Sequence, residues 1–234
     1  MTSSKSGKVR RRSPGEVRPL ILQSALELFE TRGYPGTTTR EIADRAGVAE
    51  ALVFRHFGSK AELYSEAVLG PMVDFIDEWV EFMARRRQSE KFMPEAWVQE
   101  FVERFYDVVV ANRGRLLSYL SLAEFEPELV RDLEHHSAFQ EALRNLDRST
   151  ASDADLLGIE GPVDLSLWTR SAVGMVLAMG LFCDLAAPPG MNPPSRRRTV
   201  AVMSEILVEG SFARSRRVRD TSPSSRSRAA TTKR

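Results

Sequence analysis

The sequence predicts an all-α protein with a small N-terminal helical domain and a larger helical domain behind it. Apolar residues recur at three- and four-residue intervals, which is the period of helices with one buried face. Beyond residue 70 no alternating, strand-like run and no Asn-Gly hairpin signal interrupts that period. With 42% apolar and 28% charged residues among 234, the chain can bury one sizeable core or two small ones.

The first helix is expected to begin at Pro19, because the first turn of a helix tolerates a residue without an N–H. Apolar residues between Ile21 and Phe29 then follow helical spacing, and Gly33 ends the pattern. The preceding residues, 1–18, carry a net charge of +5. We expect them to form a basic, disordered arm.

Two short helices joined by a glycine turn are predicted next. Thr38 and Glu41 have the spacing of a capping box, which starts the first of them. Gly47 supplies the turn, residues 49–56 form the second helix, and Phe57 plugs the core. In a helix-turn-helix of this kind the first helix supports the second, whose exposed face enters the major groove of DNA. A helical hairpin without a nucleic-acid role is the alternative.

A second capping box, Ser59 with Glu62, predicts the start of a fourth helix. Pro71 is expected to kink or restart this helix, which then ends near the arginines at 85–87, where cations suit the helix dipole. Further helices are expected over residues 94–113, 115–125, 128–148, 163–187 and 195–213.

Charge is strongly segregated along the larger domain and the C-terminus. Residues 71–213 carry a net charge of −9, whereas residues 214–234 carry +7 and are rich in Ser, Arg and Thr. We expect the latter to be a basic, disordered tail. Three arginines at 196–198 oppose the dipole of the last helix, so they are expected to pair with the acidic body or with a partner subunit.

The segments Thr37-Thr38-Thr39-Arg40-Glu41-Ile42-Ala43, Ala46-Gly47-Val48 and Phe54-Arg55-His56-Phe57-Gly58-Ser59-Lys60-Ala61-Glu62-Leu63 resemble the TetR family of one-component transcriptional regulators. The resemblance covers about residues 19–68. It implies a homodimer whose variable C-terminal helical domain binds a small effector. The chain would then divide into a basic arm (1–18), a DNA-binding domain (19–68), an effector-binding and dimerisation domain (69–213) and a basic tail (214–234).

The resemblance also implies which residues meet the DNA backbone. Contacts with phosphate are expected at the start of the supporting helix and on the far side of the reading helix, from Thr38, Thr39, Arg40, Phe54, His56 and Lys60. Lys60 lies at a helix N-terminus, where free N–H groups and the helix dipole already favour phosphate. Leu52 and Phe54 depart from the family pattern, which has a small hydroxyl residue and tyrosine there, so each loses a hydrogen bond to phosphate.

The exposed residues of the reading helix are expected to face the bases. Arg55 suits guanine or phosphate, Glu50 suits the cytosine amino group, and the methyl groups of Ala49 and Ala51 suit thymine methyls. In the N-terminal arm, the arginines are expected to add phosphate or minor-groove contacts, namely Arg10, Arg11, Arg12 and Arg18.

Aromatic and apolar residues of the larger domain are numerous enough to line an effector pocket, although ordinary core packing explains each one singly. The candidates are Trp79, Phe82, Met83, Trp97, Phe101, Phe105, Tyr119 and Trp168. Small and apolar residues near the C-terminus predict a dimer interface, with packing inside the chain as the alternative. These are Gly174, Met175, Ala178, Gly180, Met203, Ile206 and Leu207.

Several classes of protein are disfavoured. The single cysteine, Cys183, excludes an internal disulfide and fits a reducing cytoplasm, and no apolar run reaches the ~20 residues of a membrane span. His135 and His136 are adjacent and make a poor metal pair, so no metal is expected. No nucleophile elbow, phosphate loop or dinucleotide fingerprint occurs, so neither an enzyme nor a cofactor is expected.

The function that we expect is a dimeric repressor that a small, hydrophobic effector releases from a palindromic operator. A transcriptional activator, a constitutive DNA-binding protein without effector, and an enzyme or carrier that retains a helix-turn-helix remain as alternatives.

Overall fold

The computed structural model describes residues 14–86, 94–131, 133–153, 164–183, 190 and 192–221. Every regular element in these stretches is a helix, which confirms the all-α prediction. The helices are α1 (Pro14–Arg32), α2 (Thr39–Ala46), α3 (Glu50–Phe57), α4 (Lys60–Arg86), α5 (Pro94–Ala111), α6 (Arg113–Phe125), α7 (Pro127–Arg131), α8 (Glu134–Ser152), α9 (Leu165–Phe182) and α10 (Arg196–Thr221).

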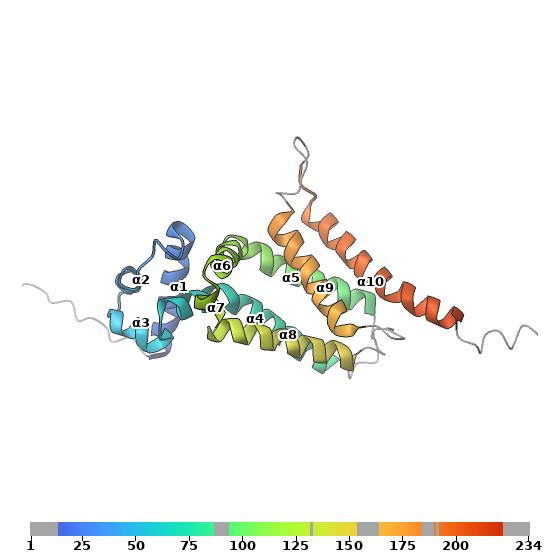
Figure 1. Ribbon diagram of the computed structural model, residues 1–234, viewed down its shortest axis with the longest axis horizontal. Coiled ribbons are helices and arrows are strands. Elements are labelled where there is room, and N and C mark those ends of the chain that lie inside the picture. The colour runs from blue at the N-terminus through green and yellow to red at the C-terminus, as the bar shows by residue number, and fades with distance from the viewer. Residues whose placement is uncertain are drawn as a thin grey trace, which may run out of the picture.

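The molecule is elongated, with α1, α2 and α3 gathered at one end (Figure 1). Helix α4 leaves this N-terminal domain and runs into the body, where α8 packs along it. On the other side of the body, α5 packs against α9 and α10. The N-terminal domain is therefore joined to the C-terminal domain chiefly through the long helix α4.

The N-terminal domain closes around a small apolar core. Ile21 of α1, Ile42 of α2 and Leu63 of α4 are completely buried, and Val53 of α3 is 1% exposed. These residues recur at the helical spacing that the sequence showed, so each short helix owes its stability to one buried face. Phe57 is buried at the end of α3, which confirms its expected place in the core.

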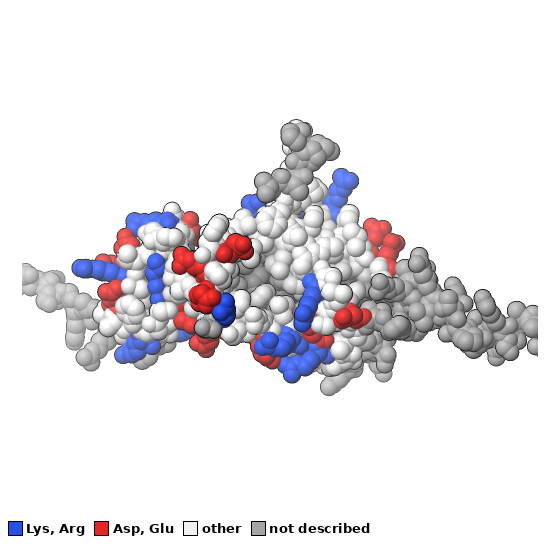
Figure 2. Space-filling view, in the orientation of Figure 1, with Lys and Arg blue, Asp and Glu red and all other residues white. Residues whose placement is uncertain are grey.

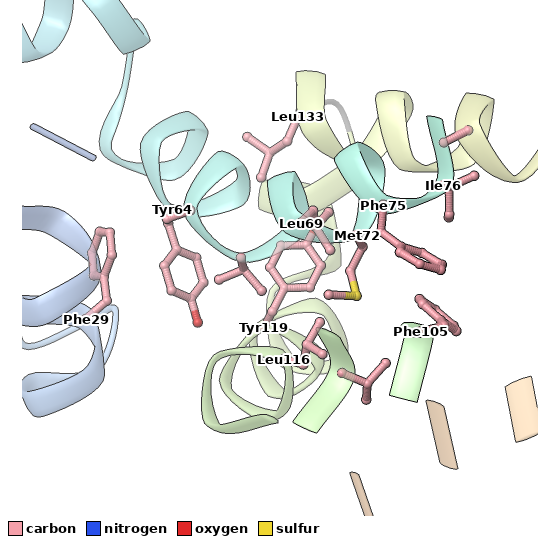
Figure 3. Packing of buried hydrophobic residues seen from close by; sticks show 14 of the residues in the cluster. Phe29, Tyr64, Leu69, Met72, Phe75, Ile76, Phe105, Leu116, Tyr119 and Leu133 are labelled. Carbon is pink, nitrogen blue, oxygen red and sulfur yellow. The ribbon is translucent and has the colours of Figure 1, made fainter. Parts of the chain in front are cut away.

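Tyr64 joins this core to the body. Its ring lies 4.8 Å from that of Phe29 on α1 and 6.1 Å from that of Tyr119 on α6, and Figure 3 shows it between the two. Aromatic rings in edge-on and tilted contact bury much apolar area. The junction between the domains is thus packed rather than open.

Pro19 and Pro71 both lie inside helices. Helix α1 begins at Pro14, five residues before Pro19, and Glu16 in its first turn complements the dipole there. Helix α4 continues through Pro71 without restarting, because Leu69, Met72 and Ile76 on both sides of it are buried in the core. Tertiary packing in this way overrides the loss of one helical hydrogen bond.

The second capping box forms only by half. The N–H of Glu62 donates to Ser59 Oγ at 3.0 Å, as expected. The Glu62 carboxylate, however, does not return to the Ser59 N–H, which bonds to the carbonyl of Phe57 instead. Both oxygens of Glu62 accept the N–H of Glu134 at 3.1 Å, so this carboxylate caps α8 rather than its own helix.

Helix boundaries in the body also differ from those predicted. The helix expected over 128–148 is two helices, α7 and α8, because Leu133 adopts extended φ and ψ and is buried. Helix α5 ends at Ala111, where Asn112 folds its side-chain amide onto the carbonyl of Val108 at 2.7 Å. Gly114 consequently lies in the first turn of α6 instead of ending α5.

Helices α9 and α10 complete the body. Helix α10 extends to Thr221, eight residues beyond its expected end. Arg196 in its first turn donates to Asp107 of α5 at 2.6 Å and lies 3.1 Å from Glu103, so this arginine pairs with the acidic body. By length and composition alone α9 is apolar enough to cross a membrane, a test that core helices of soluble proteins also pass.

Candidate nucleic-acid interface

Helices α2 and α3 form the helix-turn-helix. Thr38 caps α2 with its side chain and backbone both bonded to Glu41, which confirms the first capping box, and these bonds lower the pKa of the Glu41 carboxyl. Gly47 follows α2 in the left-handed conformation at φ 64°, where a side chain would be strained. The chain then turns directly into α3.

A hydrogen bond between the two helix starts fixes their angle. Thr39 Oγ1 of α2 donates to Glu50 Oε1 of α3 at 2.6 Å. Because the Glu50 carboxylate accepts this bond, it is held at the N-terminus of α3. Glu50 must give up or share this bond to accept from a cytosine amino group.

The outer face of α3 carries the residues expected to meet DNA. Ala51 and Arg55 are exposed, and the Phe54 ring is 47% exposed despite its apolar character. Arg40 on α2 is exposed beside them, and neither it nor Arg55 forms an ion pair with any residue that the structure describes. Figure 2 shows lysine and arginine side chains projecting from this end of the molecule.

Lys60 has a defined place before any DNA arrives. Its Nζ donates to the carbonyl of Thr37 at 2.8 Å and lies 4.1 Å from the centroid of the Tyr34 ring. Partial burial lowers the pKa of the Lys60 ammonium. The ammonium therefore links the start of α4 to the loop before α2, and its remaining N–H groups lie next to the α2 N-terminus. Tyr34 was not singled out from the sequence; its proximity to Lys60 depends on the loop's path.

His56 and Leu52 complete α3. The His56 ring is half-buried beside Phe57, and its Nε2 has no partner among the described residues. Leu52 packs against the core, so an apolar contact replaces the hydroxyl that is frequent at this position in the family that the sequence resembles.

Arg18, which was predicted to contact DNA, is held in an ion pair within the protein. Its guanidinium forms two 2.6 Å contacts with the carboxylate of Glu66 on α4 and lies 4.9 Å from the Phe57 ring. Glu66 is only 8% exposed, and sequence reasoning had no local signal for a partner 48 residues away. The other arginines assigned to the arm, Arg10, Arg11 and Arg12, lie outside the described residues.

Comparisons with known proteins agree with this geometry. The family described as bacterial regulatory proteins, TetR family, matches residues 21–67. Over 118 residues the chain is 30% identical to the HTH-type transcriptional repressor KstR2 of Rhodococcus jostii, covering 50% of this chain and 51% of KstR2. Over 88 residues it is 39% identical to the HTH-type transcriptional activator FasR of Mycolicibacterium smegmatis, covering 38% of this chain and 40% of FasR.

The likeness in fold extends over most of the chain. The crystal structure of a TetR-family regulator from Mesorhizobium loti matches with a TM-score of 0.61 and 26% identity, covering 87% of this chain and 98% of that one. Residues 21–67 of the chain therefore form a DNA-binding domain of the TetR family. The alignments span about half the length, or less, of the curated relatives named above.

The C-terminal domain contains a partly open cavity of about 50 Å³. Five of the predicted pocket residues line it: Trp79, Met83, Trp97, Phe101 and Trp168. The lining also includes residues that sequence reasoning missed, namely Val98, Leu146, Thr150, Thr169, Ala172 and Leu207. Thr169 and Ala172 follow Trp168 on one helix face, a spacing that could have pointed to them.

The other three predicted pocket residues lie elsewhere. Phe105 is completely buried against Phe75, with ring centroids 5.1 Å apart. Tyr119 packs on Tyr64 and its hydroxyl lies 3.2 Å from His136 Nδ1. Phe82 is half-buried against Trp79, with ring centroids 5.3 Å apart, and does not line the cavity. Aromatic composition alone could not separate wall residues from core residues.

The residues assigned to a dimer interface divide into two groups. Gly174, Ala178 and Ile206 are exposed, and Met175 is half-buried, whereas Met203 and Leu207 are buried within the protomer. Gly180 is also internal, because a Cβ there would lie 2.5 Å from Val109 on α5. The outward face of α9 and α10 adds apolar residues that were not predicted: Leu167, Phe182 and Val202.

The described residues contain no group of three or more potential metal ligands. His135 Nε2 lies 3.8 Å from Glu66, and His136 contacts Tyr119, so the two adjacent histidines contact different neighbours.

Proposed function

We propose that this TetR-family protein is a dimeric transcriptional repressor that leaves a palindromic operator when a small, hydrophobic effector binds its C-terminal domain. The single observation that carries the proposal is the outer face of α3, where Arg55 and Ala51 are exposed on a helix that Val53 and Phe57 anchor from behind. A reading helix must be supported in this way to enter the major groove.

Exposed apolar side chains support the dimer. Leu167 on α9 is 61% exposed and Ile206 on α10 is 55% exposed, and Gly174 and Ala178 between them leave room for a close helix approach. An apolar face of this kind on a protomer marks an interaction surface. A two-fold pair of protomers would present two α3 helices to half-sites roughly 34–36 Å apart on one side of the duplex.

Helix α4 supports coupling between effector and operator. It starts at Lys60 beside the reading helix and reaches the cavity at Trp79 and Met83 without a break. A ligand that displaces α4 in the cavity therefore displaces the N-terminal domain, and the spacing of the two α3 helices changes. The ligand then shifts the population away from the operator-binding state.

We propose repression because KstR2, which matches the longer stretch of this chain, is named a repressor. FasR, which matches a shorter stretch, is named an activator. The same geometry serves an activator, so the direction of control needs its own measurement. A protein that acts on operators works in the cytoplasm, which is where we place it. Membership of a family of regulators argues against the enzyme alternative.

Operator binding can be tested with the full chain and a duplex that carries the region upstream of its own gene. We expect Arg55→Ala to weaken specific binding roughly 10- to 100-fold, as the loss of a bidentate base contact does. Arg148→Ala, which removes an exposed charge on α8, is the matched control and should bind as the wild type does. Equal binding by the wild type and Arg55→Ala would contradict the proposal.

Control of transcription can be tested with a reporter gene behind the same region. Deletion of the regulator should raise expression if it represses and lower it if it activates. A constitutive binder would respond to no candidate effector in the same assay.

A further inference from the structure

All three tryptophans of the chain line one cavity. Trp79 on α4, Trp97 on α5 and Trp168 on α9 surround it, and Phe101 adds a fourth ring. Aromatic walls of this kind favour a flat, apolar occupant, which can stack on one ring and meet the edges of others.

One polar group in the wall lacks a partner. Thr169 is 4% exposed, and its hydroxyl oxygen finds no hydrogen-bond partner among the described residues. Other hydroxyls on these helices bond to the carbonyl one turn back, as Ser171 Oγ does to Leu167 at 2.7 Å. A desolvated hydroxyl without a partner is unfavourable, so a ligand gains affinity if it supplies one once the Thr169 side chain turns its hydroxyl to the cavity surface.

The cavity offers nothing for a charged ligand. None of its eleven lining residues carries a charge. Beside the cavity, the guanidinium of Arg104 lies 5.9 Å from the Trp79 ring and that of Arg86 lies 5.0 Å from the Phe82 ring. These cations would repel a cationic ligand from the same rings, while a buried anion would have no partner in the wall.

We propose that the cavity binds an uncharged aromatic molecule that carries one hydroxyl or similar hydrogen-bonding group, and that Thr169 recognises this group. The inference rests on the proposed function only for the statement that the occupant is the effector. A volume of about 50 Å³ is below the roughly 150 Å³ that accommodates benzene, so a single ring enters only as flexible Met83 moves aside. A long acyl chain would need a much larger displacement of the wall than a single ring does.

Phenol and toluene form a matched pair of probes, because both have one ring and one substituent of similar size. Their binding to the full-length protein can be measured by calorimetry and by quenching of tryptophan fluorescence, which reports only on the cavity wall. We expect phenol to bind about tenfold more tightly than toluene, the gain of one hydrogen bond to a buried group.

Three valine variants locate the recognising residue. Thr169→Val should abolish the preference for phenol and leave the affinity for toluene unchanged. Thr150→Val changes the other threonine of the wall, and Thr199→Val removes an equally buried, unpartnered hydroxyl on α10 that does not line the cavity. Both controls should keep the preference. Because valine has the shape of threonine, all three variants should fold, which thermal melting verifies.

Two results overturn the inference: retention of the phenol preference by Thr169→Val, or tighter binding of benzoate, benzylammonium or laurate than of phenol by the wild type. Operator release is a separate readout. If phenol binds through Thr169 but leaves operator affinity unchanged, the chemistry of the cavity stands and the effector role of the proposed function fails. If a charged or long-chain compound releases the operator, the proposed function stands and this inference fails.

Discussion

Arg115 on α6 donates from Nε to Glu30 on α1 at 2.7 Å, across the boundary between the two domains. The same guanidinium also bonds to Asn112 Oδ1 at 2.8 Å, at the junction of α5 and α6. Next to it, Arg113 donates to the carbonyl of Leu181 at the end of α9. The N-terminal domain is thereby connected to the helices of the C-terminal domain through a second route, independent of α4.

Breaking this connection should weaken communication between the domains more than it weakens the fold. Arg115 is 21% and Glu30 47% exposed as side chains, so a double-mutant cycle with Arg115→Ala and Glu30→Ala should give a coupling of about 0.5–1 kcal/mol in urea unfolding. The exposed pair Arg131 and Glu128 on α7 is the control cycle, with a coupling near zero. Either single variant should also reduce the effector's influence on operator affinity; an unreduced influence would assign the pair to stability alone.

Arg18 should matter for stability rather than for DNA. Its removal in Arg18→Met leaves the buried carboxylate of Glu66 with His135, at 3.8 Å, as its one basic partner among the residues that the structure describes. We expect a loss of about 1–2 kcal/mol in unfolding free energy, discounted because Arg18 is itself 47% exposed. The double variant Arg18→Met with Glu66→Gln should recover part of this loss. Folded Arg18→Met should keep the salt dependence of operator binding, and a flattened dependence would restore Arg18 to the interface.

Charge placed on the outward face of α9 and α10 should separate the protomers. Ile206→Glu and Leu167→Glu each introduce two carboxylates into a symmetric interface, so each should weaken the dimer at least tenfold, which sedimentation equilibrium measures. Leu120→Glu is the matched control, because Leu120 is 49% exposed on α6, away from that face. A Leu120→Glu protein that dissociates as the others do would indicate a different interface.

Tyr64 should make the fold sensitive to alkali. Burial raises the pKa of Tyr64 to about 12, above its ordinary value of 10.0. Because the folded pKa is the higher one, its contribution to stability is fully present below pH 10.0 and is lost as the pH rises toward about 12, by at most about 1.4 kcal/mol per pH unit. Tyr64→Phe should lose less stability over this window in urea titrations. An identical loss would show that Tyr64 ionises in the folded state as it does in water.

Local sequence signals predicted the N-terminal domain well, because their partners are close along the chain. Thr38 and Glu41 are three residues apart, and their capping box forms in full. The Ser59 and Glu62 pair has the same spacing, yet the Glu62 carboxylate bonds to Glu134, 72 residues away. No spacing rule could anticipate this, since the competing donor is placed by tertiary packing.

The cavity shows the same division. Tryptophans predicted that an apolar pocket was possible, and the structure collects all three around one. Phe105 and Tyr119 are aromatic like the wall residues but pack into the core. The direction of each of these side chains depends on how α5 and α6 cross α4, which the sequence does not reveal. We predicted a DNA contact for Arg18 because it follows the basic arm in the sequence. In the fold its guanidinium is held by the buried carboxylate of Glu66.

Helices α4 and α8 pack side by side and run in the same direction, and Glu62 of α4 caps the start of α8. Both helices run from the first turn of α4 to the cavity. Helix α8 reaches the cavity at Leu146 and Thr150, about 18–24 Å from Glu134 at 1.5 Å per residue. The bond from Glu134 to Glu62 opposes sliding of α8 along α4. A ligand that separates the two helices at the cavity would therefore tilt both about the Glu62 cap, which lies in the first turn of α4, next to α3.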